Sequence, residues 1–143
     1  MLIYDHLPVI DAISLQMTQL FSNIIGNALK FSRNDRRPVI TISAIGLTEE
    51  EKQGATLDPA LEYIKIKFED NGIGFKEEYE DKIFNIFQRL HRKSEYAGTG
   101  IGLAMCKKIA LNHHGDLHAR GSSENGAVFN VILPIKQLAY PIS

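Results

Sequence analysis

The chain has 143 residues, of which 44% are hydrophobic and 23% charged, so its composition is that of one globular domain spanning residues 1–143. Its formal net charge of -1 argues against the broad basic field that nucleic-acid or anionic-membrane binding needs. Cys106 is the only cysteine, which excludes an intrachain disulfide and a cysteine zinc cluster. We expect a lone buried thiol in a reducing, cytoplasmic compartment. No signal peptide or long apolar run is recognisable, so no direct membrane contact is expected.

The strongest helical pattern covers Leu15 to Phe31, where apolar residues recur at about 100° per residue on one face. Ser14 is the expected N-cap of this helix. Before it, Val9-Ile10 is a candidate for a short strand. The apolar face of the helix is therefore expected to contribute to the core.

Two β-branched runs follow the helix and predict strands at Val39–Ile45 and Tyr63–Phe68. The segment between them, Leu47–Leu61, is polar and charged. We interpret it as a surface loop or a hairpin connection between the two strands.

The second half of the chain predicts a short amphipathic helix over Glu77–Phe87 and another over Gly102–Asn112, with Gly115 at the C′ position of the latter. Two closing strands are expected at Asp116–Arg120 and Ala127–Leu133. Adjacent strand pairs with helices between the pairs predict an α/β (α+β) fold. We expect a two-layer α/β sandwich with a mixed β-sheet and three main helices.

Four polar side chains share one face of the first helix, within an arc of about 80°: Gln19, Asn23, Asn27 and Lys30. A solvated face is the plain interpretation, but such a face favours Glu, Lys or Gln, because Asn costs about 0.6 kcal/mol relative to Ala inside a helix. The two asparagines therefore indicate a function. Amide oxygens are hard neutral ligands suited to Mg²⁺, which also binds substrate phosphates, and Lys30 is placed to reach the same phosphates.

The segment Asp70-Asn71-Gly72-Ile73-Gly74-Phe75 follows a strand, and its two glycines permit a sharp bend and close approach to a ligand. An ordinary turn is one interpretation, and an EF-hand is excluded because the ligands required after the glycine are missing. In the functional interpretation, the Asp70 carboxylate accepts a hydrogen bond from adenine N6, while Ile73 and Phe75 line an apolar pocket. A carboxylate only accepts hydrogen bonds, so it favours adenine over guanine.

The glycine-rich run Gly98-Thr99-Gly100-Ile101-Gly102-Leu103 precedes a helix, whose free N–H groups and dipole make it a candidate phosphate site. A Rossmann motif needs a strand directly before the glycines, and a P-loop needs Gly-Lys-Ser/Thr; neither is present. The preceding segment, Gln88–Tyr96, is polar and basic. We interpret it as a mobile flap whose Arg89, Arg92 and Lys93 contact phosphates on closure, with solvated loop charges as the alternative.

Together these sites resemble the catalytic ATP-binding domain of two-component sensor histidine kinases, within the wider family of histidine kinase, gyrase, Hsp90 and MutL-type ATPases. Gln19–Phe31 is similar to the N box, Asp70–Phe75 to the first glycine box, Ile83–Arg89 to the F box, and Gly98–Leu103 to the second glycine box. The resemblance covers nearly the whole chain. It implies the Bergerat-type ATP-binding fold, with ATP and Mg²⁺ as ligands.

The resemblance also implies a role at each motif position. Asn27 would ligate Mg²⁺, with Asn23 beside it in the polar site. Lys30 would contact phosphate, Phe31 would pack near adenine, and Arg89 is the candidate γ-phosphate contact. The remaining positions would shape the nucleotide pocket, with Asp70 at adenine N6 and backbone N–H groups at the phosphates: Asp70, Gly72, Ile73, Gly74, Phe75, Gly98, Thr99, Gly100, Ile101, Gly102 and Leu103.

In this family the phospho-accepting histidine lies on a separate helical dimerisation region, and none of this chain's histidines has that sequence setting: His6, His91, His113, His114 and His118. His113 and His114 are expected at a helix C-terminus, where the dipole favours a protonated, poorly nucleophilic imidazole. We therefore expect the catalytic half of a histidine kinase. It would donate the γ-phosphate of ATP to a histidine on the dimerisation domain of the same full-length protein, upstream of a response regulator receiver domain. The alternatives are a related serine kinase or ATPase, and a nucleotide-binding scaffold without turnover.

Overall fold

The computed structural model describes residues 1–4, 6–53, 57–85, 102–122 and 126–137. One mixed sheet contains the strands β1 to β5 in the order β1-β2-β3-β5-β4. Among the strands of the described residues, only β1 and β2 pair in parallel, while the remaining neighbours are antiparallel. The strand bounds are Leu2–Tyr4 for β1, Ile40–Gly46 for β2, Tyr63–Asp70 for β3, Asp116–Ser122 for β4 and Gly126–Pro134 for β5.

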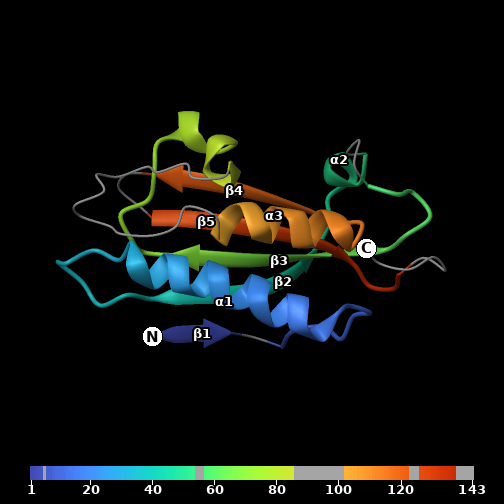
Figure 1. Ribbon diagram of the computed structural model, residues 1–143, viewed down its shortest axis with the longest axis horizontal. Helices are drawn as coiled ribbons and strands as arrows, with labels where there is room; N and C mark the ends of the chain where they lie inside the picture. Colours follow the sequence, from blue (N-terminus) through green and yellow to red (C-terminus); the bar gives the residue numbers. More distant parts are fainter. Residues whose placement is uncertain (5, 54–56, 86–101, 123–125, 138–143) are drawn as a thin grey trace.

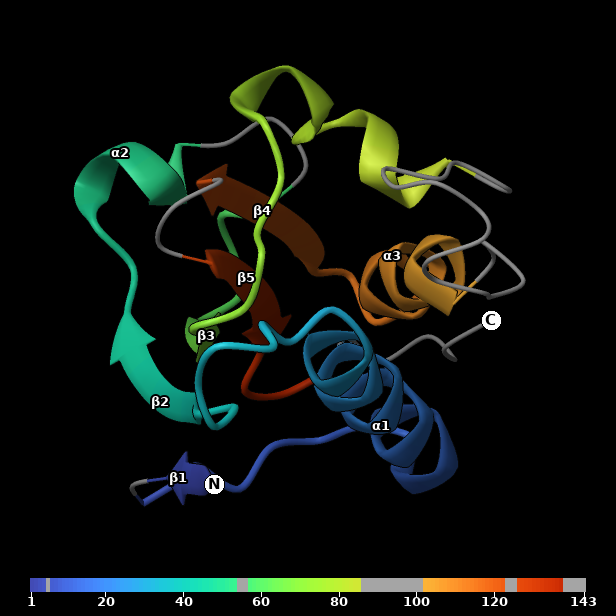
Figure 2. The same cartoon turned by 90° about the vertical axis from the view of Figure 1, so that its left-hand side faces the viewer.

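Helices α1 (Ser14–Lys30) and α3 (Gly102–Asn112) lie side by side over one face of the sheet (Figures 1 and 2). The short helix α2 (Glu49–Lys52) lies apart from them. This arrangement confirms the two-layer α/β sandwich with a mixed sheet. None of the helices in the described part of the chain combines the length and apolar character needed to cross a membrane.

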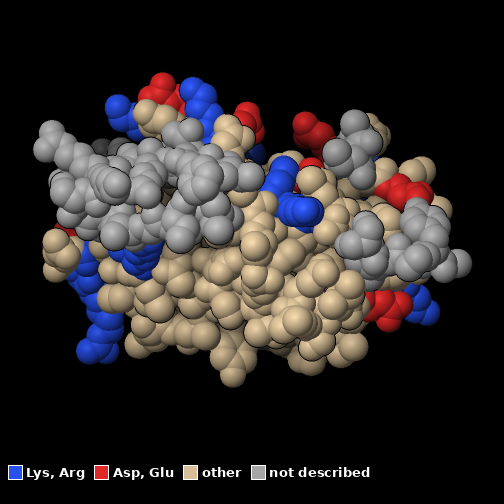
Figure 3. Space-filling model, in the orientation of Figure 1, with Lys and Arg blue, Asp and Glu red and all other residues tan. Residues whose placement is uncertain are grey.

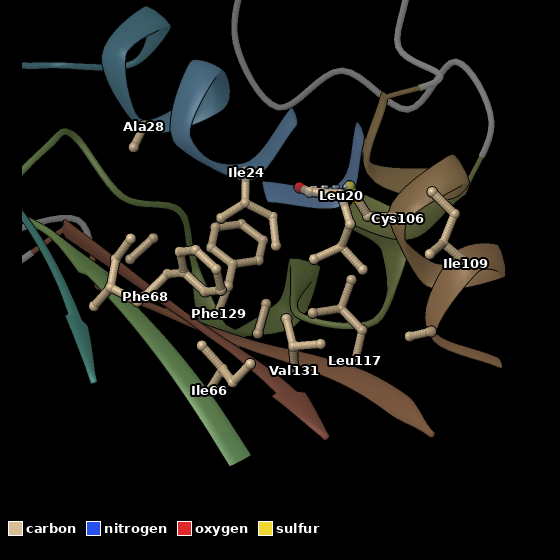
Figure 4. Packing of buried hydrophobic residues seen from close by; sticks show 14 of the residues in the cluster. Leu20, Ile24, Ala28, Ile66, Phe68, Cys106, Ile109, Leu117, Phe129 and Val131 are labelled. Atoms are coloured by element: carbon tan, nitrogen blue, oxygen red, sulfur yellow. Dashed lines mark hydrogen bonds between the residues drawn. The ribbon is translucent and has the colours of Figure 1, made fainter. Parts of the chain in front are cut away.

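The core fills the space between the two helices and the sheet (Figure 4). Leu20 and Ile24 of α1 are at most 1% exposed and face Phe68 and Phe129 of the sheet. Full burial of each such side chain contributes about 1.5–3 kcal/mol. Cys106 of α3 is buried in the same core, as expected, and its Sγ lies 3.7 Å from the Leu20 carbonyl oxygen.

The N-terminal end of α1 differs from the expectation. Ile13 is the N-cap residue and makes no side-chain cap bond, so the assignment of Ser14 as N-cap was wrong. No strand forms at Val9-Ile10; the first strand is β1. Ile10 instead packs against the core, and the Asp11 N–H donates to the Ile135 carbonyl at 2.8 Å. Val9 is 94% exposed, so only one residue of the pair packs against the core and the segment needs no strand to place it.

The polar segment Leu47–Leu61 connects the antiparallel neighbours β2 and β3, which confirms a hairpin connection. It also contains α2, whose first turn has a capping box between Thr48 and Glu51. Glu51 pairs with Lys65 of β3 at 2.7 Å, and this ion pair attaches the helix to the sheet. The sequence Thr-Glu-Glu-Glu is the signal that indicates such a helix start.

The segment Glu77–Phe87 does not form the continuous helix expected from its pattern. Its described part contains two 3₁₀ turns, Glu77–Tyr79 and Lys82–Phe84. A helix this short gains little from intrinsic propensity, so tertiary packing decides its geometry. The separate turns let Ile83 enter the core at 4% exposure while Phe84 packs against its edge.

Helix α3 ends in a Schellman motif. The Gly115 N–H donates to the Ala110 carbonyl and the His114 N–H donates to the Leu111 carbonyl. His114, with φ 66°, therefore occupies the left-handed C′ position that was expected for Gly115. Gly115 is needed for a different reason: a Cβ there would overlap the Ile132 carbonyl.

Candidate nucleotide-binding site

The polar face of α1 turns toward the start of α3. Asn23 is half-buried, and its Nδ2 donates to the Gly102 carbonyl at 3.4 Å. One turn earlier, the exposed Gln19 contacts Met105 of α3. The amide face predicted from the sequence thus lies beside the helix that follows the glycine-rich run.

Asn27 and Lys30 continue this face toward the C-terminal end of α1. Asn27 is half-buried, and within the described part of the chain no hydrogen bond engages its side-chain amide. Lys30 is exposed, with its Nζ 5.8 Å from the centroid of the Phe31 ring. An amide oxygen and a mobile ammonium fit the needs of a hydrated cation and of phosphate oxygens, respectively.

Asp70 is the last residue of β3. One oxygen of its carboxylate accepts two backbone hydrogen bonds. Its Oδ1 accepts the Gly72 N–H at 2.9 Å and the Ala127 N–H at 3.2 Å. Burial raises the pKa of the Asp70 carboxyl, and the two N–H groups oppose that rise. The second oxygen, Oδ2, is then the atom that can accept a hydrogen bond from a base amine.

Close backbone contacts hold the Asp70 turn against the end of α1. The Ile73 N–H donates to the Phe31 carbonyl at 3.0 Å. A Cβ on Gly72 would lie 2.5 Å from that same oxygen, and a Cβ on Gly126 (φ 87°) would overlap the Asp70 carbonyl. Glycine is therefore required at both positions by close approach, and Phe31 and Asp70 become neighbours.

Asn71 fixes the other side of the turn, a role that the sequence reasoning missed. Its Oδ1 accepts the Val39 N–H at 2.9 Å, and its Nδ2 donates to the Arg37 carbonyl at 3.0 Å.

The segment 31–39, which ends at these hydrogen bonds, is basic. Its Arg33 and Arg36 both lie near Asp35. Figure 3 shows Lys and Arg side chains gathered at the left end of the molecule, where α1 ends. Positive charge near the turn favours an anionic ligand.

Phe75 and Ile73 support the turn to different degrees. Phe75 is only 7% exposed, and its ring centroid lies 6.5 Å from that of Phe129 in the core. Ile73 is half-buried, and Gly74 has the left-handed φ of 64° that a side chain disfavours. Phe75 thus supports the turn from the core, while the pocket-lining role expected for both residues stays a prediction.

The glycine-rich run is described only at its end. Gly102 begins α3, and Leu103 packs against the core. The other expected phosphate contacts lie outside the described residues, as does the flap at 88–96: Arg89, Arg92, Lys93, Gly98, Thr99, Gly100 and Ile101. The structure therefore brings together the amide face of α1, the start of α3 and, at the end of α1, the Asp70 turn.

One histidine differs from the expectation. His113 is fully buried, and its Nε2 accepts the Ile13 N–H at 3.0 Å. A ring nitrogen that accepts a hydrogen bond carries no proton, so the expectation of a protonated His113 was wrong.

Comparisons with known proteins place the chain in a family. The family described as histidine kinase-, DNA gyrase B-, and HSP90-like ATPase matches residues 12–137. Cyanobacterial phytochrome A of Nostoc sp. is 41% identical over 132 residues, covering 92% of this chain and 15% of that protein. The sensor protein kinase WalK of Staphylococcus aureus is 36% identical over 121 residues, covering 83% of this chain and 26% of the relative.

A solved structure extends the comparison to the fold. The mycobacterial sensor histidine kinase MprB matches with a TM-score of 0.71 at 17% identity, covering 96% of this chain and 84% of that one. The chain thus spans a small part of the length of its phytochrome relative, while it matches most of the MprB structure.

Proposed function

The chain belongs to the family of histidine kinase-, DNA gyrase B- and HSP90-like ATPases, and from this premise we propose that it is the catalytic half of a cytoplasmic sensor histidine kinase. It binds ATP with Mg²⁺ and donates the γ-phosphate to a histidine on a separate dimerisation domain of the same full-length protein. The observation that carries the proposal is the Asp70 carboxylate, held by Gly72 and Ala127 beside the end of the α1 amide face.

The Asp70 turn binds the adenine base. With Oδ1 engaged by two backbone N–H groups, Oδ2 accepts the hydrogen bond of adenine N6. Guanine presents an oxygen at the corresponding position, which a carboxylate repels. Gly72 and Gly74 let the backbone approach the base, and Phe31 packs beside it.

Helices α1 and α3 bind the phosphates and the metal ion. The Asn27 amide oxygen would be the protein ligand for Mg²⁺, which would supply positive charge to offset that of the phosphates. Asn23 holds the start of α3 close to this face through Gly102. The N-terminus of α3 directs N–H groups and its positive dipole end toward the phosphates, and Lys30 adds a mobile cation. Arg89 and the glycines before Gly102 are assigned to the phosphate site from the sequence motifs.

Phosphoryl transfer needs a nucleophile in line with the leaving oxygen. His113 is buried within the fold, and no histidine of the chain has the sequence setting of a phospho-acceptor. The acceptor histidine therefore comes from the dimerisation domain. A response regulator receiver domain then takes the phosphoryl group from that histidine.

Incubation with γ-labelled ATP and Mg²⁺ tests the proposal. We expect no label on this chain alone and label on an added dimerisation domain from the same full-length protein. A dimerisation domain with its histidine changed to glutamine is the matched control and should stay unlabelled.

Three results would contradict this function. Acid-labile, base-stable label on the isolated chain that is lost in His114→Ala would place the acceptor within it. Acid-stable label on serine would indicate a serine kinase. ATP binding in calorimetry without any label on the dimerisation domain would indicate a nucleotide-binding scaffold without turnover.

A further inference from the structure

Both ring nitrogens of the fully buried His113 make hydrogen bonds. Nδ1 donates to the Ile109 carbonyl at 2.9 Å, and Nε2 accepts the Ile13 N–H at 3.0 Å. These partners fix the neutral imidazole with its proton on Nδ1, because a carbonyl requires a donor and an N–H requires an acceptor. The ring therefore has one tautomer and one orientation.

The Nε2 bond joins the ends of two different helices. Ile13 is the N-cap residue of α1, and His113 directly follows α3. The same junction contains Gln137, whose Nε2 donates to the His113 carbonyl at 3.0 Å. His113 thus fastens the start of α1 to the end of α3 from inside the protein.

The nucleotide-binding residues lie at the opposite ends of these helices. At about 1.5 Å per residue, Asn27 lies about 21 Å along α1 from Ile13, and Gly102 lies about 16 Å along α3 from His113. At the nucleotide end, the described polar link between the motifs is the Asn23–Gly102 bond, which at 3.4 Å is long. A change in the angle between the helices at the His113 end would therefore displace Asn27 from Gly102.

We propose that His113 is a positioning residue of the nucleotide site. By fixing the start of α1 on the end of α3, it sets the spacing between the α1 amide face and the N-terminus of α3. The role rests on the proposed function, because only a ligand bound by both helices is sensitive to that spacing. A mutation far from the reacting atoms that misplaces them by about 1 Å can cost about 100-fold in rate.

An isosteric pair of variants tests this role. His113→Gln keeps an oxygen that can accept the Ile13 N–H, whereas His113→Met has the same length and no such acceptor. ATP affinity in the presence of Mg²⁺ is measured by calorimetry, well below the unfolding temperature of each variant. We expect His113→Met to weaken ATP binding about tenfold and His113→Gln to restore most of it.

A core variant separates positioning from general stability. Val131→Ala removes a fully buried side chain of β5 and lowers the unfolding temperature without removing the His113 bond. It should leave ATP affinity unchanged in the folded protein. If His113→Met does not fold, His113→Asn replaces it, since its shorter amide reaches the Ile109 carbonyl and not the Ile13 N–H.

The outcomes are distinguishable. A folded His113→Met or His113→Asn protein with wild-type ATP affinity would overturn the positioning role. An equal loss of affinity in Val131→Ala would also overturn it, because general destabilisation would then account for the effect. Failure of the wild-type chain to bind ATP would contradict the proposed function itself.

Discussion

The Oδ1 atom of Asp70 accepts the backbone N–H of Ala127 at 3.2 Å, which joins the end of β3 to the start of β5. The same oxygen accepts the Gly72 N–H at 2.9 Å. The carboxylate thus has one oxygen committed to the fold and a second one available to a ligand. This division makes the structural and binding roles of Asp70 separable by mutation.

Asp70→Asn should leave the fold intact and weaken ATP binding. The asparagine carbonyl can keep both N–H bonds, but its NH₂ then replaces Oδ2 and opposes the adenine amine, which is also a donor. Loss of a hydrogen bond to a charged group predicts about 10- to 100-fold weaker binding by calorimetry. Unchanged ATP affinity in this variant would remove Asp70 from the base site.

The same variant should gain stability at neutral pH in the absence of nucleotide. Burial raises the pKa of the Asp70 carboxyl above its unfolded value. Between those two values the folded state binds more protons, so stability falls as pH rises through this window. Asp70→Asn removes that cost. Urea unfolding should show the variant at least as stable as wild type at pH 7, with the difference shrinking below about pH 4.

Lys107→Met should destabilise the domain, because it removes the ammonium that is bonded to a buried carboxylate. Lys107 Nζ donates to Asp116 Oδ1 at 2.7 Å and to the Leu117 carbonyl at 2.8 Å, and Asp116 is 5% exposed. We expect a loss of about 2 kcal/mol in the free energy of unfolding at pH 7, measured by urea denaturation. The double variant Lys107→Met/Asp116→Asn should recover part of this loss.

The pH dependence of the Lys107 effect follows from Asp116. Burial acts to raise the pKa of the Asp116 carboxyl, but the bonds from Lys107 and the Leu117 N–H outweigh burial and lower it. The pair therefore contributes stability above the unfolded pKa of Asp116, which is lost as pH falls through the lowered folded value. The difference between wild type and Lys107→Met should shrink in acid. A constant difference down to pH 2 would contradict this assignment.

Gly26→Ala should stabilise the protein by about 1 kcal/mol, because glycine inside a helix is unfavourable by that amount. Gly26 is exposed in α1, and a Cβ there would meet nothing within 4 Å. Gly115→Ala is the contrasting variant, since its Cβ would overlap the Ile132 carbonyl. Thermal unfolding should show a higher midpoint for the first variant and a lower one for the second.

The sequence predicted the parts of the fold that depend on periodicity. The apolar arc of α1 and the β-branched runs of β2 and β3 come from side chains that contact one continuous core. These patterns were long enough to identify element and face together. The pattern of Glu77–Phe87 was too short to identify its element, because the geometry of this segment depends on where Ile83 and Phe84 contact the core.

The sequence predicted which residues belong to the candidate site, but only in part how they contact one another. The Asn23 and Asn27 spacing and the glycines of the Asp70 turn are visible in the sequence. The contact of Ile73 with the Phe31 carbonyl and that of His113 with the Ile13 N–H join residues 42 and 100 positions apart. Local patterns contain no information on such pairs. Asn71 was missed because its amide serves the backbone at Val39 and Arg37.

The central claim is that the α1 amide face and the Asp70 turn form one site for ATP with Mg²⁺. It is tested most directly by ATP affinity with and without Mg²⁺ in wild type, Asn27→Ala and the same-face control Gln19→Ala. Alanine favours the helix, so neither variant should unfold. We predict that Mg²⁺ strengthens ATP binding in wild type and Gln19→Ala, and that Asn27→Ala loses this gain while it still binds adenosine. An undiminished Mg²⁺ effect in Asn27→Ala would contradict the claim.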